Sequence, residues 1–316
     1  MNKPLLLCAL LWIFAVGAVH AQKAPHIVFI MGDEEYRSEE SLPMLARIME
    51  KQLKAKISLC YSLNKEGYID PNVTDHIDGL EALKTADLMV IFARWRNLPE
   101  QERRYILDYV ESGKPVVGFR TSTHTFMYKN QPELEYLINE WPAKVFGQQW
   151  ITHHGHFDDG MAALTSVRGL GKTHPILSGV EDFKAHSWLY HVDGGQWKLQ
   201  GDVHPLMEGT SLKSGHAMKG ETDKYPLVQP VAWTKTYTGK VRKTSRVFFT
   251  TLGHPYDFKE IAMRRLAIQG MYWALGLEKK IPSTGLNVDF IEAYAPNNSG
   301  FGAKFKAGQK PIKIGK

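Results

Sequence analysis

The chain has 316 residues, a 43% hydrophobic composition and a formal net charge of +6. A chain of this length can bury a large core without disulfide bonds. The positive charge is unevenly placed, because residues 279–316 hold seven lysines against Asp289 and Glu292. The rest of the chain is close to neutral, so the composition does not indicate a nucleic-acid-binding protein.

The N-terminus has the features of an export signal. Lys3 precedes an apolar run over residues 5–18, and small residues lead up to Ala21. A buried helix or a membrane anchor is the alternative, but the run is short for a span of about 20 residues. We therefore expect a signal peptide over residues 1–21, no membrane span after its cleavage, and a periplasmic or secreted protein. Of the two cysteines, Cys8 leaves with the signal and Cys60 remains, which favours a periplasm over a disulfide-bonded extracellular module.

The first half of the mature chain alternates strand and helix patterns. Continuous apolar runs are typical of strands that are buried on both faces. Strands are predicted over residues 26–31, 56–63, 87–93 and 115–119, and helices over 41–53 and 98–112. This alternation predicts a mainly parallel sheet with right-handed crossovers.

The second half has shorter strand patterns. Strands are predicted over 162–167, 186–192, 203–208, 229–237 and 246–252, and a helix over 258–275. We expect antiparallel additions to the same sheet, with the last strand returning to its centre. The fold class is therefore α/β, with one domain over residues 22–278. The basic tail over 279–316 is expected to lie on the surface or to be disordered.

Ionisable side chains follow four of the predicted strands. In an open parallel sheet, ligands bind outside the carboxyl ends of the strands. The segments at these ends are 32–37, 94–96, 120–124 and 253–257, and they are rich in Arg, His, Asp and Glu. The sequence therefore predicts a functional cleft at this edge of the sheet.

Histidines supply the first candidate chemistry. The segment 148–159 contains His153, His154 and His156 beside two aspartates. Imidazole suits zinc and related divalent metals, so His124, His154 and His254 are a candidate ligand set. Acid–base catalysis, or hydrogen bonding to a polyol, is an equally open use of these side chains. Neighbouring residues of an extended chain point to opposite sides, so only some of them can face one cleft.

Arginines supply a second candidate chemistry, the binding of anionic groups. Arg94, Arg96 and Arg120 could clamp a carboxylate or phosphate, or they could pair with the acidic run 33–35 and hold the loops. Both interpretations are open. The chain has no GxGxxG after the first strand, no P-loop and no GxSxG motif, which disfavours dinucleotide, nucleotide and serine-hydrolase functions.

Several segments together resemble a known family. They are 32–40, 118–124, 145–147 leading to 153–155, 174–179 and 252–254. In this order and spacing, over residues 26–277, the chain resembles exported ThuA-like proteins of the trehalose-utilisation type. The resemblance implies a flavodoxin-like sheet related to the class I glutamine amidotransferases.

The amidotransferases present a nucleophilic cysteine at the turn after the fourth strand. Here the turn at 118–122 carries no thiol, and Cys60 lies in the second predicted strand, where a small buried residue is expected. Glutamine hydrolysis by a thiolate is therefore excluded. Ser122 is an alternative nucleophile, with His124 or His254 as its base.

The resemblance implies a role in the metabolism of trehalose and related sugars, through keto-sugar intermediates. Tyr36, Trp95, Trp150 and Trp188 could stack on pyranose faces, or they could be core residues. The candidate catalytic residues are His124, His254, Glu34, Glu35 and Arg120. The candidate substrate contacts are Asp33, Tyr36, Arg37, Arg94, Arg96, Ser122, His153 and Tyr256.

The leading hypothesis is a carbohydrate-active lyase, hydrolase or isomerase that uses acid–base chemistry, with or without a divalent metal such as zinc. Its partner would be a small carbohydrate, and an oligomer is compatible with the sequence. The alternatives are a non-catalytic protein that binds a glycan or an anion, and a structural partner within an exported sugar-processing complex.

Overall fold

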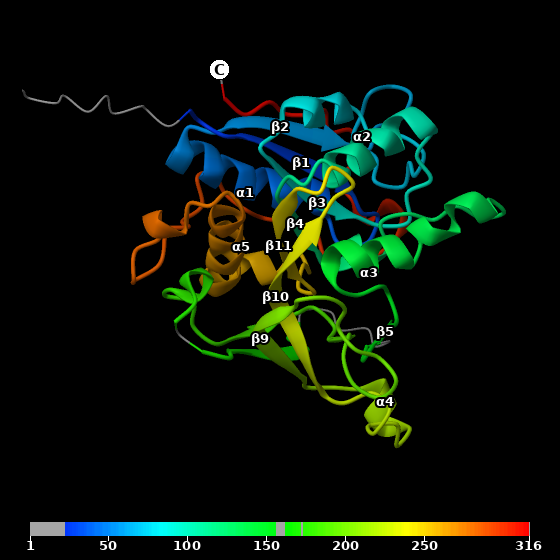
Figure 1. Cartoon of the computed structure of the whole chain (residues 1–316), viewed down its shortest axis with the longest axis vertical. Helices are drawn as coiled ribbons and strands as arrows, with labels where there is room; N and C mark the ends of the chain where they lie inside the picture. The colour runs from blue at the N-terminus through cyan, green and yellow to red at the C-terminus, as the bar shows by residue number, and fades with distance from the viewer. Residues whose placement is uncertain (1–22, 156–161, 172, 316) are drawn as a thin grey trace, which may run out of the picture.

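The computed structural model of the protein describes residues 23–155, 162–171 and 173–315. The predicted signal peptide lies outside these residues, as do His156 and the two aspartates that follow it. Within the described part of the chain, the structure is built on a nine-stranded sheet in the order β2-β1-β3-β4-β11-β10-β9-β6-β7 (Figure 1).

Five strands form the parallel part of the sheet. They are β1 (His26–Gly32), β2 (Lys56–Tyr61), β3 (Leu88–Ala93), β4 (Val116–Phe119) and β11 (Thr244–Thr250). Residues of β1 pair with both β2 and β3, so Ile27 lies between Ile57 and Leu88. The mainly parallel order that the apolar runs predict is confirmed.

Helices cover both faces of this parallel part, as Figure 1 shows. Helices α1 (Ser38–Leu53) and α5 (Ile261–Ala274) pack on one face. Helices α2 (Glu100–Glu111) and α3 (Glu140–Phe146) pack on the other. Successive strand residues point to opposite faces, so Phe29 and Phe248 enter the first core while Val28 and Phe249 enter the second.

The second half of the chain extends the sheet with antiparallel strands. These are β10 (Val228–Thr238), β9 (His204–Ser211), β6 (Thr165–Gly169) and the short β7 (Phe183–Ala185). As predicted, β11 returns to the centre, where it pairs in parallel with β4 and in antiparallel with β10. A short helix, α4 (Gly215–Met218), lies beyond these strands.

Two predicted elements differ in the structure. Of the strand predicted over 186–192, only β8 (Tyr190–His191) forms, and it pairs with β5 (Thr152–His153) in a separate two-stranded sheet. The reason is that Ser187 is bonded to Asp257 instead of to a neighbouring strand. The last helix begins at Ile261 because residues 257–259 form a 3₁₀ turn.

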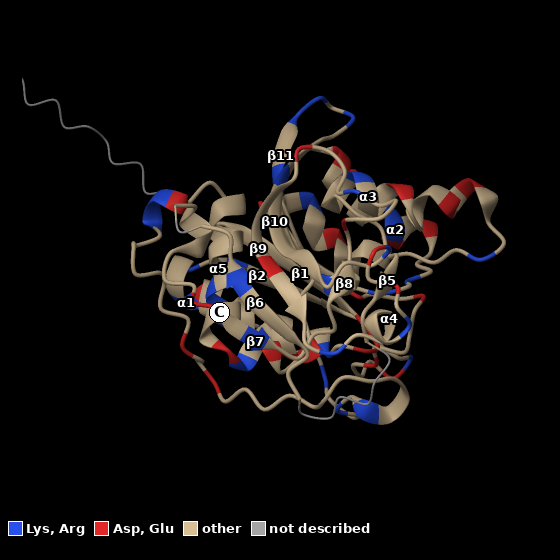
Figure 2. Cartoon of the chain, turned by 90° about the horizontal axis from the view of Figure 1, so that it is seen from below, with Lys and Arg blue, Asp and Glu red and all other residues tan. Residues whose placement is uncertain are grey.

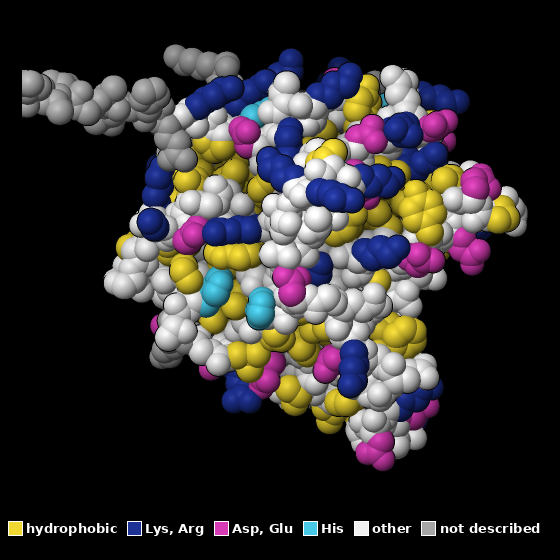
Figure 3. Space-filling model, in the orientation of Figure 1, with side chains coloured by type: hydrophobic (Ala, Val, Ile, Leu, Met, Phe, Trp, Pro, Cys, Tyr) yellow, Lys and Arg dark blue, Asp and Glu magenta, His cyan; other side chains and the backbone are white. Residues whose placement is uncertain are grey.

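Charges of both signs are mixed on the surface. Figures 2 and 3 show Lys and Arg interspersed with Asp and Glu on the faces they display, so neither view shows a field of a single sign. No helix among the described residues is both long and apolar enough to cross a membrane.

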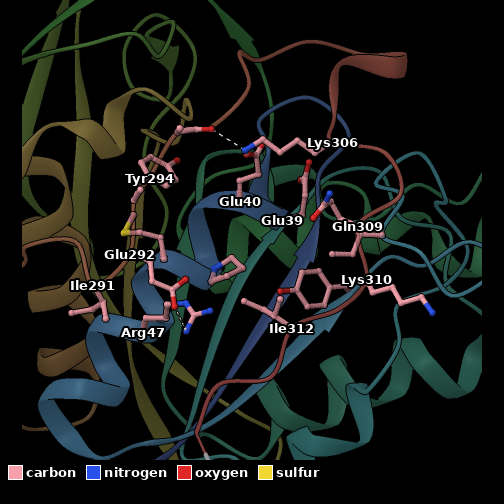
Figure 4. A pocket seen from close by; sticks show the side chains of 16 residues that line it. Glu39, Glu40, Arg47, Ile291, Glu292, Tyr294, Lys306, Gln309, Lys310 and Ile312 are labelled. Atoms are coloured by element: carbon pink, nitrogen blue, oxygen red, sulfur yellow. Dashed lines mark hydrogen bonds and ion pairs between the residues drawn. The ribbon is translucent and has the colours of Figure 1, made fainter.

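The C-terminal tail packs along the body of the protein. The Tyr294 hydroxyl donates to the Pro255 carbonyl at 2.9 Å, and the Ile69 amide donates to the Gln309 carbonyl at 2.8 Å. Between the tail and α1 lies a pocket of about 340 Å³, in which Glu39, Glu40 and Arg47 face tail residues (Figure 4). The tail is therefore bonded to the domain at several points.

Glu39 in this pocket makes a pH-dependent contribution to stability. Its side chain is 8% exposed, and the nearest cation is Arg37, with Nη1 3.7 Å from Oε1. Burial raises the pKa of Glu39 from 4.5 to about 7, against the opposing charge of Arg37. Because the folded-state pKa is the higher one, the protonated carboxyl stabilises the fold below pH 4.5, and this stabilisation is lost as the pH rises through 7.

We therefore expect Glu39→Gln to gain stability relative to the wild type as the pH rises. The difference in unfolding free energy between the two proteins should shift by on the order of 3 kcal/mol between about pH 4.5 and pH 8. Urea unfolding at a series of pH values measures this difference. Parallel stability curves for the two proteins would contradict the expectation.

Candidate functional site

The polar segments predicted at one edge of the sheet do meet there. They follow β1, β3, β4 and β11, whose carboxyl ends lie side by side in the sheet. Asp33 organises the first of them, because its Oδ1 accepts from the Glu35 and Tyr36 amides at 2.7 Å each. Its Oδ2 accepts from the Thr121 hydroxyl, which ties the turn after β1 to the turn after β4.

Arg120 lies at the centre of this edge. It is the first residue after β4 and has a φ of 37°, a left-handed conformation that is strained for a non-glycine residue. Its guanidinium carbon lies 4.3 Å from the Tyr36 ring centroid and 4.4 Å from the Tyr190 ring centroid. The guanidinium donates to the Thr251 carbonyl at 2.8 Å and to the Tyr36 hydroxyl at 2.9 Å. A permanent positive charge is thus fixed beneath the site.

Arg94 and Arg96 hold the loops through ion pairs. Both contact the carboxylate of Glu34, and Arg96 Nη2 lies 2.5 Å from Glu34 Oε2. Arg96 is fully buried, and it also donates to the carbonyls of Pro71 at 3.0 Å and Val73 at 2.8 Å. Of the two interpretations left open for these arginines, the structure favours loop pairing.

Glu35 is placed differently from Glu34. Its nearest ion-pair partner is Arg94, with 3.3 Å between Nε and Oε2, and its side chain is 14% exposed. Burial and the neighbouring charge of Asp33 raise the pKa of Glu35 to about 7, while Arg94 and Arg120 oppose the shift. A carboxyl group that is half protonated near neutral pH and reaches the surface can act as a general acid.

The pKa of His124 is lowered, whereas that of Glu35 is raised. Burial lowers the pKa of His124 well below 6.5, and the positive charges of Arg94 and Arg120 lower it further. Its Nδ1 lies 3.1 Å from the Thr123 hydroxyl oxygen, and that hydroxyl donates to the Arg120 carbonyl at 3.3 Å. The tautomer of His124 that satisfies both contacts has its proton on Nδ1, and its Nε2 then keeps a lone pair that can accept one.

Aromatic side chains enclose His124. The Trp150 ring centroid is 5.1 Å from that of His124, and the Trp95 centroid is 5.8 Å from it. His153 continues this wall, with centroid distances of 4.6 Å to Trp188 and 5.3 Å to Trp150. The three tryptophans and His153 are partly exposed, as expected of a wall that can contact a ligand.

His254 lies beside Tyr36, with 6.3 Å between the two ring centroids. Burial, His186 and Arg120 lower its pKa well below 6.5, although a hydrogen bond with the Asn298 side chain opposes the shift. Within the described residues, the potential metal ligands that cluster are His186, His254 and Asp257, with their ligand atoms within 4.8 Å of one another.

Asp257 in this cluster already has a structural role. Its Oδ2 accepts from the Ser187 hydroxyl at 2.5 Å and from the His254 amide at 3.1 Å, and its Oδ1 accepts from the His186 amide at 2.6 Å. These bonds occupy both carboxylate oxygens, so Asp257 is a poorer ligand than its position suggests. Of the two imidazoles, that of His254 already accepts from the Tyr256 amide through Nδ1 at 3.1 Å.

His154 points away from this site. The two residues His153 and His154 alternate across the extended chain, as the sequence indicated. Nδ1 of His154 lies 2.7 Å from the Ser214 hydroxyl oxygen, and its ring faces His216 at 5.5 Å. Burial and His216 lower its pKa to about 4. The candidate ligand set of His124, His154 and His254 is therefore divided between two places.

Several other candidates are positioned by the fold without reaching a ligand surface. The Ser122 hydroxyl is buried and donates to the Ile91 carbonyl at 2.9 Å, which occupies its proton. Arg37 is fully buried and donates to the Gly300 carbonyl at 2.9 Å. Tyr256 packs against His254, and its ring lies 4.1 Å from the Lys259 ammonium.

The comparisons with known proteins agree with this fold. Residues 28–274 match the ThuA family, described as trehalose utilisation. The chain belongs to the ThuA family. A ThuA-like protein from Parabacteroides merdae ATCC 43184 shares its fold with 18% identity and a TM-score of 0.50, over 80% of this chain and 90% of that chain.

A second solved ThuA-like protein, from Bacteroides uniformis ATCC 8492, has 17% identity and a TM-score of 0.49, over 82% of this chain and 95% of that chain. Among curated proteins, none matches the chain. The family resemblance drawn from the sequence is thus confirmed, together with the mainly parallel, flavodoxin-like sheet.

In this member of the ThuA family, the residue presented by the turn after β4 is Arg120. The thiol of Cys60 is fully buried in β2, and burial raises its pKa far above its ordinary value. The ThuA match also ends at residue 274, so the tail that packs on the domain lies beyond the matched region.

Sequence reasoning assigned no role to two contributors to the site, although Asp257 lies in the segment 253–257 that it placed there. The Tyr190 ring packs against the Arg120 guanidinium. Asp257 accepts hydrogen bonds from the amides of residues 186 and 187, and so links this segment to the turn after β11. Tyr190 has no neighbouring motif in the sequence. The signal that existed was the position of Asp257, three residues after His254 in a segment that follows a buried strand.

Proposed function

We propose that this ThuA-family protein is an exported enzyme that acts on a sugar or keto-sugar derivative by acid–base chemistry. The observation that carries the proposal is that Glu35 and His124 lie at one edge of the sheet: Glu35 is 3.3 Å from Arg94, and the His124 carbonyl accepts from the amide of the next residue, Trp95, at 2.9 Å. Both are neighbours of Arg94 and Arg120, and their pKa values are shifted in opposite directions. Two titratable groups whose environments push their pKa values apart are the usual arrangement of an acid and a base.

The chemistry follows from the placement of these groups. Glu35 in its protonated form donates a proton to an oxygen of the substrate, and Nε2 of His124 accepts a proton from a carbon or hydroxyl group. The buried charge of Arg120 stabilises negative charge that develops on a carbonyl or enediolate oxygen. The aromatic wall of Trp150, Trp188 and Trp95 suits the apolar faces of a pyranose ring.

The substrate class rests on the family description, trehalose utilisation, and on this aromatic wall. The export of the protein rests on the sequence of residues 1–21, and a mature N-terminus at residue 22 in mass spectrometry would support it. A zinc or related ion at His186 and His254 would assist the same chemistry as a Lewis acid.

A ligand screen tests the proposal. Thermal shift with disaccharides, keto-sugars and sugar acids, with and without divalent metals, should raise the melting temperature for at least one sugar class, because a ligand that binds the native state stabilises it. Turnover of that ligand, followed by NMR, then separates catalysis from binding. Binding without turnover would contradict the proposed enzyme and favour the alternative, a non-catalytic glycan-binding protein.

A further inference from the structure

The C-terminal tail reaches the candidate site from outside the family region. The family match ends at residue 274, yet the Gly300 amide donates to the Glu35 carbonyl at 2.7 Å. The Gly300 carbonyl in turn accepts from Arg37 Nη2 at 2.9 Å. These two bonds fix residue 300 directly against the segment that carries the proposed acid.

The next residue, Phe301, extends over the side chain of Arg94. The ring centroid of Phe301 lies 4.9 Å from the guanidinium carbon, and the Trp95 ring lies 3.6 Å from the same carbon. The ion pairs of Arg94 with Glu34 and Glu35 hold this guanidinium in place. Phe301 is therefore fixed beside Glu35 by the tail backbone on one side and by Arg94 on the other.

Phe301 nevertheless remains 53% exposed. Burial of an aromatic ring is favourable, and a ring held at the rim of a site with half of its surface in water presents a flat apolar face to a ligand. The tail contributes a second contact through Asn298, which hydrogen-bonds His254. The tail thus touches the proposed site near Glu35 and near His254.

We propose that the tail forms one wall of the substrate site and that Phe301 is a stacking platform for the outer ring of a disaccharide. The inference rests on the proposed function, and it makes Phe301 a specificity-determining residue. A monosaccharide bound at Glu35 and His124 would leave the platform empty, whereas a second ring would cover it. Recognition of the second ring would then belong to this tail and not to the matched ThuA region.

Isothermal titration with glucose, trehalose, maltose and cellobiose tests this inference. Phe301→Ala should weaken the binding of the preferred disaccharide by roughly tenfold, the upper end for an aromatic contact, and leave glucose binding within about twofold. Phe301→Trp should restore the disaccharide affinity. The matched control is Phe290→Ala, because Phe290 lies in the same tail, is 37% exposed and stacks on Arg264 at 3.9 Å.

The outcomes separate this inference from the proposed function. Equal loss of glucose and disaccharide affinity in Phe301→Ala, or an equal effect of Phe290→Ala, would show a merely structural role for Phe301. Unchanged affinities in Phe301→Ala would overturn the platform while leaving the proposed function in place. A wild-type protein that binds none of the four sugars would count against the proposed function and the inference together.

Discussion

Glu35→Gln should lower turnover by about 10²- to 10⁴-fold, the usual contribution of a general acid or base. The amide keeps the size of the carboxyl group but has no transferable proton, so ligand binding should change little. Stability should also be preserved, because the ion pair of Glu35 with Arg94 is only one of the contacts that hold that arginine. Single-turnover kinetics on the sugar identified by the ligand screen measures the effect.

The pH dependence provides a second readout of the same assignment. Glu35 acts in its protonated form and has a pKa of about 7, so kcat/KM should fall as the pH rises above 7. His124 acts in its neutral form, and since its pKa is lowered well below 6.5, the acid limb should appear only below that value. The control is Glu66→Gln, an exposed position far from the site in sequence. An alkaline limb that persists in Glu35→Gln would assign it to another group.

Glu34→Ala should destabilise the protein by roughly 3–5 kcal/mol. The substitution leaves Arg96 fully buried without its counter-ion, and an uncompensated buried charge is among the most costly single changes. Arg94 would lose a partner as well. Urea unfolding at neutral pH, followed by tryptophan fluorescence, measures the loss.

Glu292→Ala is the matched control for this experiment. Glu292 also pairs with an arginine, at 3.0 Å from Arg47 Nη1, but its side chain is 60% exposed. A solvent-exposed ion pair contributes about 0–1 kcal/mol, so this variant should unfold close to the wild type. Equal effects of the two substitutions would mean that Arg96 finds other compensation, and that the pair with Glu34 does not hold the loops.

The parallel part of the fold could be predicted because its signals are local. An apolar run such as residues 26–31 fits a strand buried on both faces, and alternation with helices then fixes the sheet type. The return of β11 to the centre followed from its apolar character. The strand predicted over 186–192 was mostly wrong, because Ser187 bonds to Asp257 some 70 positions away. No local pattern reveals such a contact.

The location of the candidate site at the strand ends could be predicted from the sequence, but the roles of its individual residues could not. The rule that strand ends meet at one edge brought Glu35, Arg120 and His124 together from the sequence alone. The roles of Glu34 and Glu35 could not be separated in this way, because they are adjacent carboxylates. Their difference depends on burial and on which arginine atoms reach each of them. The position of Phe301 at the site could not be predicted, because this residue lies in a lysine-rich segment without strand or helix periodicity.

The tail also has a consequence for solubility. Strand β2 lies at one end of the sheet order and β7 at the other, and open strand edges invite pairing between molecules. The edge at β7 is only three residues long. At the other edge, Ile312 of the tail lines a common pocket with Tyr61 of β2, and Gln309 bonds to Ile69 nearby. A chain cut at residue 274 would uncover the surface around Tyr61 beside this edge, and it should aggregate where the full-length protein stays dispersed.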